Sequence, residues 1–202
     1  MNAIATHSRY RLGGKKVEKK IPQPKLLTYE NYVKLTPPDS GNYELLNGQI
    51  YFMASPKPSH QRISLRLSYF LAACVIPNNL GEIFPAPMDV IFTEHDTFQP
   101  DLLFITKDRL SIIGENKIEG TPDLVVEILS PSNDTKEMSY KKHIYGSTGV
   151  KEYWLINVEK QTLTLYKQID NELRWQKDIQ KNEVLQSEII TGFELDLSKI
   201  FE

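Results

Sequence analysis

The sequence predicts an α/β domain in which a few helices flank a mixed β-sheet. Apolar residues recur with helical spacing between Ile63 and Val75, and short apolar runs typical of buried strands occupy 102–105 and 123–129. The expected elements follow the order ββαβββαβββ. Strands that outnumber the helices between them favour a mixed sheet with helices packed on its faces.

Local signals along the chain predict each of these elements. A short helix is expected within 26–35, and Asn47-Gly48 then predicts a hairpin, because both turn positions need positive φ and apolar strands flank the pair at 43–46 and 49–53. The long helix that contains Ile63 should end before Pro77. Apolar runs bounded by turn residues predict the other elements, namely strands at 88–92, 102–105, 123–129, 152–158, 162–167 and 173–177, a polar helix at 133–145 closed by Gly146 and Gly149, and a last short strand or edge cover within 189–201.

Charge divides the chain of 202 residues into two parts, predicted to be a flexible basic tail at 1–25 and a single domain at 26–202. The tail carries seven Lys and Arg against one Glu, so it is +6 and the rest is −8. A basic tail can be an arm that contacts nucleic acid, but a solubilising leader is the commoner explanation. An acidic body is unlike a tight non-specific DNA binder.

Several classes of protein are disfavoured. The single cysteine, Cys74, excludes an internal disulfide, and no apolar run is long enough to cross a membrane. The first twenty residues lack a secretory apolar region, so we expect a cytoplasmic protein with no membrane partner. The sequence has no nucleophile elbow, Walker loop or dinucleotide-binding turn.

Two acidic residues, Glu127 and Asp101, indicate a candidate functional site. Glu127 lies in the middle of an apolar strand, where a carboxylate needs a cation or a proton, so a structural ion pair and a divalent metal are both open. Asp101 follows Pro100 at the entrance of another buried strand, where alone it would be a strand-entry cap. Together, the two acids on neighbouring strands give oxygen ligands that suit Mg²⁺, with Mn²⁺ as a substitute.

These residues also resemble a known family. Pro100-Asp101 followed by Glu127 resembles the PD-(D/E)XK signature of restriction-endonuclease-like nucleases. Five ordered motifs are similar to those of the bacterial endonuclease family called Uma-two, and they occupy 43–48, 55–60, 99–102, 125–132 and 149–154. The resemblance covers about 26–167. It implies a restriction-endonuclease-like mixed sheet flanked by helices. It also implies Mg²⁺-dependent cleavage of nucleic acid, with DNA as the expected substrate, and a homodimer if both strands are cut.

The sequence departs from the superfamily pattern at one position. The lysine of the signature should lie two residues after the acid, where this chain has Leu129. The resemblance implies that Lys141, on the following helix, takes the lysine's role of positioning the attacking water or stabilising charge on the phosphate. Without the resemblance, Lys141 would read as an ordinary solvent-facing lysine.

Three further residues are supporting candidates. Glu44 matches an acid of the family and is a third metal ligand, a partner of Lys141 or a surface residue. His60 opens the long helix, where it is an N-terminal polar group or a phosphate contact. Asp123 shares a strand face with Glu127 and either supports the site or, more simply, caps the strand.

Three functional hypotheses follow. The first is a metal-dependent endonuclease with Asp101, Glu127 and Lys141 as catalytic residues. The second is a catalytically inactive binding module, for nucleic acid or protein, that retains the fold; the acidic body and Leu129 favour it. The third is a structural metal or ion-pair site in a protein of unrelated function. Metal affinity separates the first from the second, and the third predicts that Glu127→Gln changes stability alone.

Overall fold

The computed structural model describes residues 26–36, 42–129 and 135–202. The tail predicted at 1–25, and with it the domain boundary, lies outside these residues. The elements in chain order are α1 (Tyr29–Leu35), β1 (Asn42–Leu46), β2 (Gln49–Met53), α2 (Pro58–Val75), β3 (Gly81–Pro85), β4 (Val90–Thr93), β5 (Asp96–Phe98), β6 (Leu102–Thr106), the 3₁₀ helix η1 (Lys107–Ile112), β7 (Ile118–Glu119), β8 (Leu124–Leu129), α3 (Thr135–Thr148), β9 (Glu152–Asn157), β10 (Thr162–Ile169), β11 (Glu172–Gln180), β12 (Val184–Gln186), β13 (Glu194–Asp196) and α4 (Ser198–Phe201).

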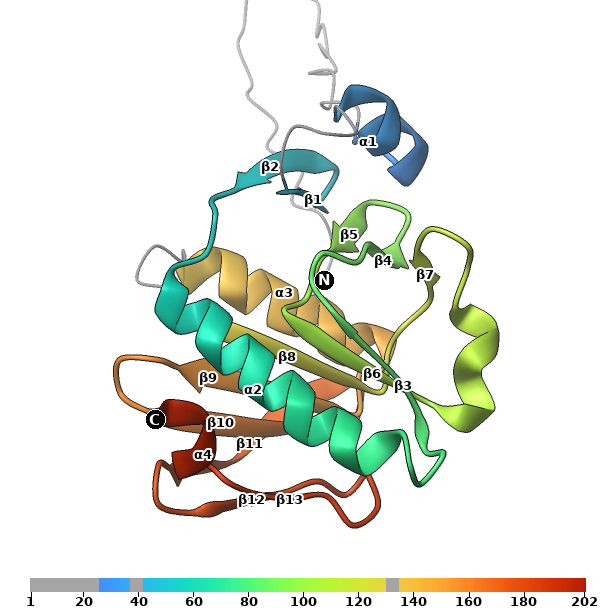
Figure 1. The fold of residues 1–202 in the computed structure, drawn as a ribbon. Coiled ribbons are helices and arrows are strands. Elements are labelled where there is room, and N and C mark those ends of the chain that lie inside the picture. The colour runs from blue at the N-terminus through green and yellow to red at the C-terminus, as the bar shows by residue number, and fades with distance from the viewer. Residues whose placement is uncertain (1–25, 37–41, 130–134) are drawn as a thin grey trace, which may run out of the picture.

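A six-stranded mixed sheet forms the centre of the molecule, with the order β11-β10-β9-β8-β6-β3. Its strands pair antiparallel except β8 and β9, which are parallel and joined through α3. Helices α2 and α3 lie on opposite faces of this sheet (Figure 1). The α/β prediction of a mixed sheet flanked by helices is therefore confirmed.

Side-chain alternation in the central strands explains why both faces need a helix. Leu102 and Val126 pack with α2, whereas Leu103 and Val125 pack with α3. Successive strand residues point to opposite faces, so a strand that is apolar throughout must be covered on both sides. Glu127 has the parity of Val125 and consequently points to the α3 side.

A second sheet, with the order β2-β1-β5-β4-β7, packs against the α3 side. Its buried residues Leu46, Val90 and Phe98 share a core with Tyr145 of α3. The predicted hairpin is confirmed, since β1 and β2 pair antiparallel and the turn residues Asn47 and Gly48 have φ of 48° and 68°.

Strands β3, β5, β7 and β12 were not predicted, because each is short or contains residues unusual in strands. Strand β3 begins with Gly81 and ends with Pro85, and β5 has three residues. The predicted end of the polar helix at Gly146 was also wrong, because α3 continues to Thr148. Position 146 of α3 needs a glycine, because a Cβ there would approach the backbone nitrogen of Leu173 to 2.7 Å.

None of the helices in the described ranges is long and apolar enough to cross a membrane.

We expect Gly48→Ala to lower the free energy of unfolding by about 2 to 4 kcal/mol. Its φ of 68° costs a side chain roughly 1 to 2 kcal/mol, and a Cβ would also lie 2.6 Å from the Cβ of Leu26. Gly192→Ala is the control, because φ is 77° there but no atom lies within 4 Å of the added Cβ. Urea unfolding should show a smaller loss for Gly192→Ala, and equal losses would contradict the steric argument.

Candidate functional site

The strand register brings Asp101 and Glu127 together. Leu102 of β6 pairs with Val126 of β8, so one further step along this antiparallel pair sets Asp101 opposite Glu127. The backbone N–H of Ile128 donates a hydrogen bond to Asp101 Oδ2 at 2.7 Å. The chain thus fixes the two carboxylates at the same end of adjacent strands.

His60 contacts the same carboxylate from α2. Its Nε2 lies 3.1 Å from Asp101 Oδ2, and the residue is buried in the first turn of the helix. Burial lowers the pKa of His60, but the hydrogen bond and charge of Asp101, with the charge of Glu127, more than offset this and raise it. His60 therefore positions Asp101, and both of Asp101's contacts described above use Oδ2.

Helix α3 supplies the partners of Glu127. Tyr145 Oη donates a hydrogen bond of 2.6 Å to Glu127 Oε1, and Lys141 Nζ lies 3.6 Å from the same oxygen. Lys141 and Tyr145 are four residues apart, which places them on one helix face. Both of these contacts use Oε1 of Glu127 rather than Oε2.

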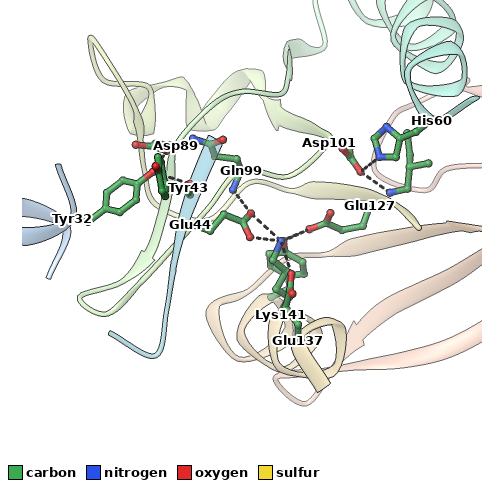
Figure 2. A network of polar contacts seen from close by, with 12 residues as sticks. Tyr32, Tyr43, Glu44, His60, Asp89, Gln99, Asp101, Glu127, Glu137 and Lys141 are labelled. Carbon is green, nitrogen blue, oxygen red and sulfur yellow. Dashed lines mark hydrogen bonds and ion pairs between the residues drawn. The ribbon is translucent and has the colours of Figure 1, made fainter. Parts of the chain in front are cut away.

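Lys141 is only 2% exposed and points into a group of carboxylates (Figure 2). Its Nζ lies 2.8 and 2.7 Å from the two oxygens of Glu44, and 3.9 Å from Glu137. Nζ also lies 5.5 Å from the centroid of the Phe98 ring. The structure thus makes Glu44 the main partner of Lys141, one of the three possibilities left open by the sequence.

The electrostatic balance of this group is negative. Among the described residues, Glu44, Glu127 and Glu137 lie around the Lys141 ammonium. Asp101 lies opposite Glu127 and is contacted by His60, which adds positive charge only when it is protonated. Burial raises the pKa of Glu127 to about 7, with the charges of Asp101 and Glu44 adding to it and that of Lys141 opposing it. Burial lowers the pKa of Lys141, but the charges of Glu127 and Glu44 outweigh this and raise it. A further cation bound here would therefore reduce the electrostatic repulsion among these carboxylates.

Gln99 links the site to the second sheet and was not a sequence candidate. Its backbone N–H donates to Glu44 Oε1 at 2.8 Å, and its side-chain Nε2 donates to Asp89 Oδ1 at 2.8 Å. Asp89 also accepts a hydrogen bond of 3.4 Å from Tyr32 Oη (Figure 2). The position of Gln99 directly before Pro100-Asp101 was the available signal. Tyr145 was not a sequence candidate either, although its i+4 spacing from Lys141 was an available signal.

Asp123 belongs to a different network at the opposite end of β8. Its Oδ2 accepts hydrogen bonds from the N–H and hydroxyl of Thr106, and its Oδ1 lies 2.8 Å from both Arg109 Nη1 and Lys151 Nζ. Burial raises the pKa of Asp123, but Lys151, Thr106 and Arg109 outweigh it and hold the pKa below its usual value. Asp123 thus joins β6, η1 and the residue that precedes β9 at the entrance of β8, away from Glu127.

The donor chemistry of Asp101 and Glu127 fits a hard divalent cation. Their contacts described above leave one oxygen of each unengaged, and Mg²⁺ needs few protein carboxylates because it keeps several waters. Glu44, the third predicted ligand, instead turns both oxygens toward Lys141. Within residues 26–36, 42–129 and 135–202, no group of three or more His, Cys, Asp or Glu is arranged to hold a metal. The fitting set is therefore the pair.

A comparison with solved structures identifies the class of fold. A crystal structure of a putative nuclease belonging to DUF820, from Anabaena variabilis, matches with a TM-score of 0.73 and 20% sequence identity. The match covers 87% of this chain and 97% of that one. The fold is the restriction-endonuclease-like fold, as the sequence predicted.

The family follows from a separate comparison. The family model Uma2, described as "Putative restriction endonuclease", matches residues 29–198. The chain belongs to this family, which confirms the resemblance seen in the sequence and makes the protein nuclease-like. A search of curated proteins found no match.

We expect Asp123→Asn to lower the free energy of unfolding by about 2 kcal/mol at pH 7, because charged hydrogen bonds to a fully buried carboxylate are lost. Folding lowers the pKa of Asp123. The contribution of Asp123 to the free energy of unfolding is therefore complete above the unfolded-state pKa near 4, and it declines as the pH falls through the lower folded-state pKa. Urea unfolding of wild type and Asp123→Asn from pH 7 to pH 3 should therefore show a difference in the free energy of unfolding that narrows only below about pH 4. A gap that stays constant with pH would contradict this.

We expect Lys141→Met to cost about 3 to 5 kcal/mol of unfolding free energy, because it leaves Glu44 and Glu127 buried without their cation. Adding Glu44→Gln should recover at least about 1 kcal/mol, since the amide removes one stranded charge. Glu94→Gln, at a side chain that is 73% exposed, serves as the control for a carboxylate change. A Lys141→Met protein as stable as wild type would show that this buried pair does not stabilise the fold.

Proposed function

We propose that the chain is a metal-dependent endonuclease that hydrolyses DNA phosphodiester bonds at the site formed by Asp101, Glu127 and Lys141. The observation that carries the proposal is the convergence of the Asp101 and Glu127 carboxylates beside the buried ammonium group of Lys141, in a chain that belongs to a nuclease-like family. A buried acidic group of this kind is stabilised by a divalent cation or by a proton on Glu127.

In this proposal Asp101 and Glu127 hold Mg²⁺, for which Mn²⁺ can substitute. The bound cation would supply polarisation of a phosphoryl oxygen and a lowered pKa for the attacking water. The chain's own groups fix the two ligands. His60 and the N–H of Ile128 orient Asp101, while the Tyr145 hydroxyl orients Glu127 and leaves its second oxygen available.

Lys141 acts beside Glu127 in this proposal. An ammonium has three N–H donors, and Glu44 lies within hydrogen-bond distance through both oxygens. The hydrogen bond from Lys141 Nζ to Glu44 Oε1 leaves donors for Glu127 or for a water bound next to it. Glu44 and the N–H of Gln99 thereby hold the ammonium where it stabilises negative charge developing on the phosphate.

A second candidate is a catalytically inactive module that binds nucleic acid or protein. Its support is the engagement of Lys141, which is 2% exposed and already paired with Glu44, so the ammonium is not presented to solvent. The acidic body agrees with this alternative. The two candidates differ in metal affinity, because only the endonuclease needs Asp101 and Glu127 ionised and convergent on a cation.

The deciding experiment is nicking of supercoiled plasmid by purified protein with Mg²⁺ or Mn²⁺. We expect cleavage that requires metal and falls by roughly 100-fold or more in Asp101→Asn and in Glu127→Gln, because each removes one charged ligand. Lys141→Met should lower the cleavage rate as well, and circular dichroism should first establish that this variant folds. Glu94→Gln is the matched control and should cleave as wild type does.

If no cleavage is seen, calorimetry with Mg²⁺ and Mn²⁺ shows whether the protein binds metal at all. A folded wild type that is silent on plasmid, single-stranded DNA and RNA, and that binds neither ion, would favour the binding module. Cleavage that survives Asp101→Asn or Glu127→Gln unchanged would place the chemistry elsewhere in the molecule.

A further inference from the structure

Helix α2 exposes a stripe of large apolar side chains on its outer face. Leu65, Tyr69 and Ile76, the last at the end of the helix, are 72%, 67% and 68% exposed. Helix α2 lies across one face of the six-stranded sheet (Figure 1). Its inner face packs on that sheet through Ile63, Leu67, Leu71 and Val75, so the exposed stripe faces away from the sheet. Scattered apolar residues are ordinary on a surface, but an aligned set indicates a contact site.

The spacing of the stripe is that of a helix–helix seam. Leu65, Tyr69, Ala72 and Ile76 follow one another in steps of four, three and four residues. This is the a/d repeat, which keeps one line of side chains facing a partner helix. The seam therefore fits another helix better than it fits an extended peptide or a flat surface.

We infer that the seam binds the α2 helix of a second copy of this chain, with the two helices antiparallel about a twofold axis. An axis between positions 70 and 71 sets Leu65 opposite Ile76 of the second copy, and Tyr69 opposite Ala72 of the second copy. The bulky aromatic side chain thus meets the smallest residue of the seam, and two aliphatic side chains of similar volume meet each other. A twofold contact must be self-complementary in this way.

Charge selects the antiparallel direction. The N-terminal half of α2 carries Arg62 and Arg66, and the helix has no acidic residue in its first turn and no basic residue in its last. A parallel pair would set Arg62 against Arg62 of the second copy. In the antiparallel pair the exposed Arg62 lies near the C-terminal end of the other α2, where helix carbonyls favour a cation.

The pairing is independent of catalysis and would hold for either proposed function. Because His60 lies in the first turn of α2, the twofold sets two copies of the candidate site at opposite ends of the helix pair. A dimer of this form offers an endonuclease one site for each strand. The seam is short, so we expect weak association that depends on protein concentration.

The test is sedimentation equilibrium of the full chain from low to several hundred micromolar protein. We expect wild type to approach twice the chain mass, and Leu65→Lys or Ile76→Glu each to raise the dimer dissociation constant by roughly tenfold or more. The variant with both changes should dimerise again, because each introduced lysine faces an introduced glutamate across the axis. That recovery would not follow from loss of folding or from a seam in any other register.

Leu35→Lys on α1 is the matched control, since Leu35 is 61% exposed and lies outside the seam. It should sediment as wild type does. A wild type that stays at the chain mass throughout the concentration range would overturn the inference. So would a dimer that Leu65→Lys and Ile76→Glu leave intact, or a double variant that dissociates as readily as the single ones.

Discussion

The buried ammonium group of Lys141 is the constraint on which the rest of the site depends. A charge in a protein interior costs several kcal/mol unless oppositely charged groups surround it. Glu44 from β1 and Glu127 from β8 meet this need, and they come from different sheets. Helix α3 therefore holds the two sheets in one arrangement. The N–H of Gln99 donates to Glu44, so the same network reaches the residue that precedes Pro100-Asp101.

The two ends of the β6–β8 strand pair show how environment divides the work of similar carboxylates. At one end Asp123 meets Arg109 and Lys151, which lower its pKa and make it a structural joint. At the other end Asp101 and Glu127 share far less positive charge, and the pKa of Glu127 rises to about 7. Binding a cation would therefore relieve more electrostatic repulsion at the Glu127 end than at the Asp123 end. This contrast separates the candidate site from an ordinary buried ion pair.

Helix α2 connects the core, the site and the surface. Its inner face completes the apolar core of the central sheet, and His60 in its first turn contacts Asp101. Its outer face carries the seam defined by Leu65, Tyr69, Ala72 and Ile76.

The sequence by itself determined the elements whose signals are local. Asn47-Gly48 defined its hairpin because positive φ is a property of those two residues, and the apolar run around Glu127 defined a buried strand. Family motifs added the fold and the choice of candidate residues. Only the tertiary structure decided that Glu44 faces Lys141, 97 positions away, and that Asp123 stands apart from Glu127. Strand alternation fixes which face a side chain takes, but not which distant strand, helix end or cation lies against that face. Those contacts arise from sheet order and helix placement, which no short stretch of sequence encodes.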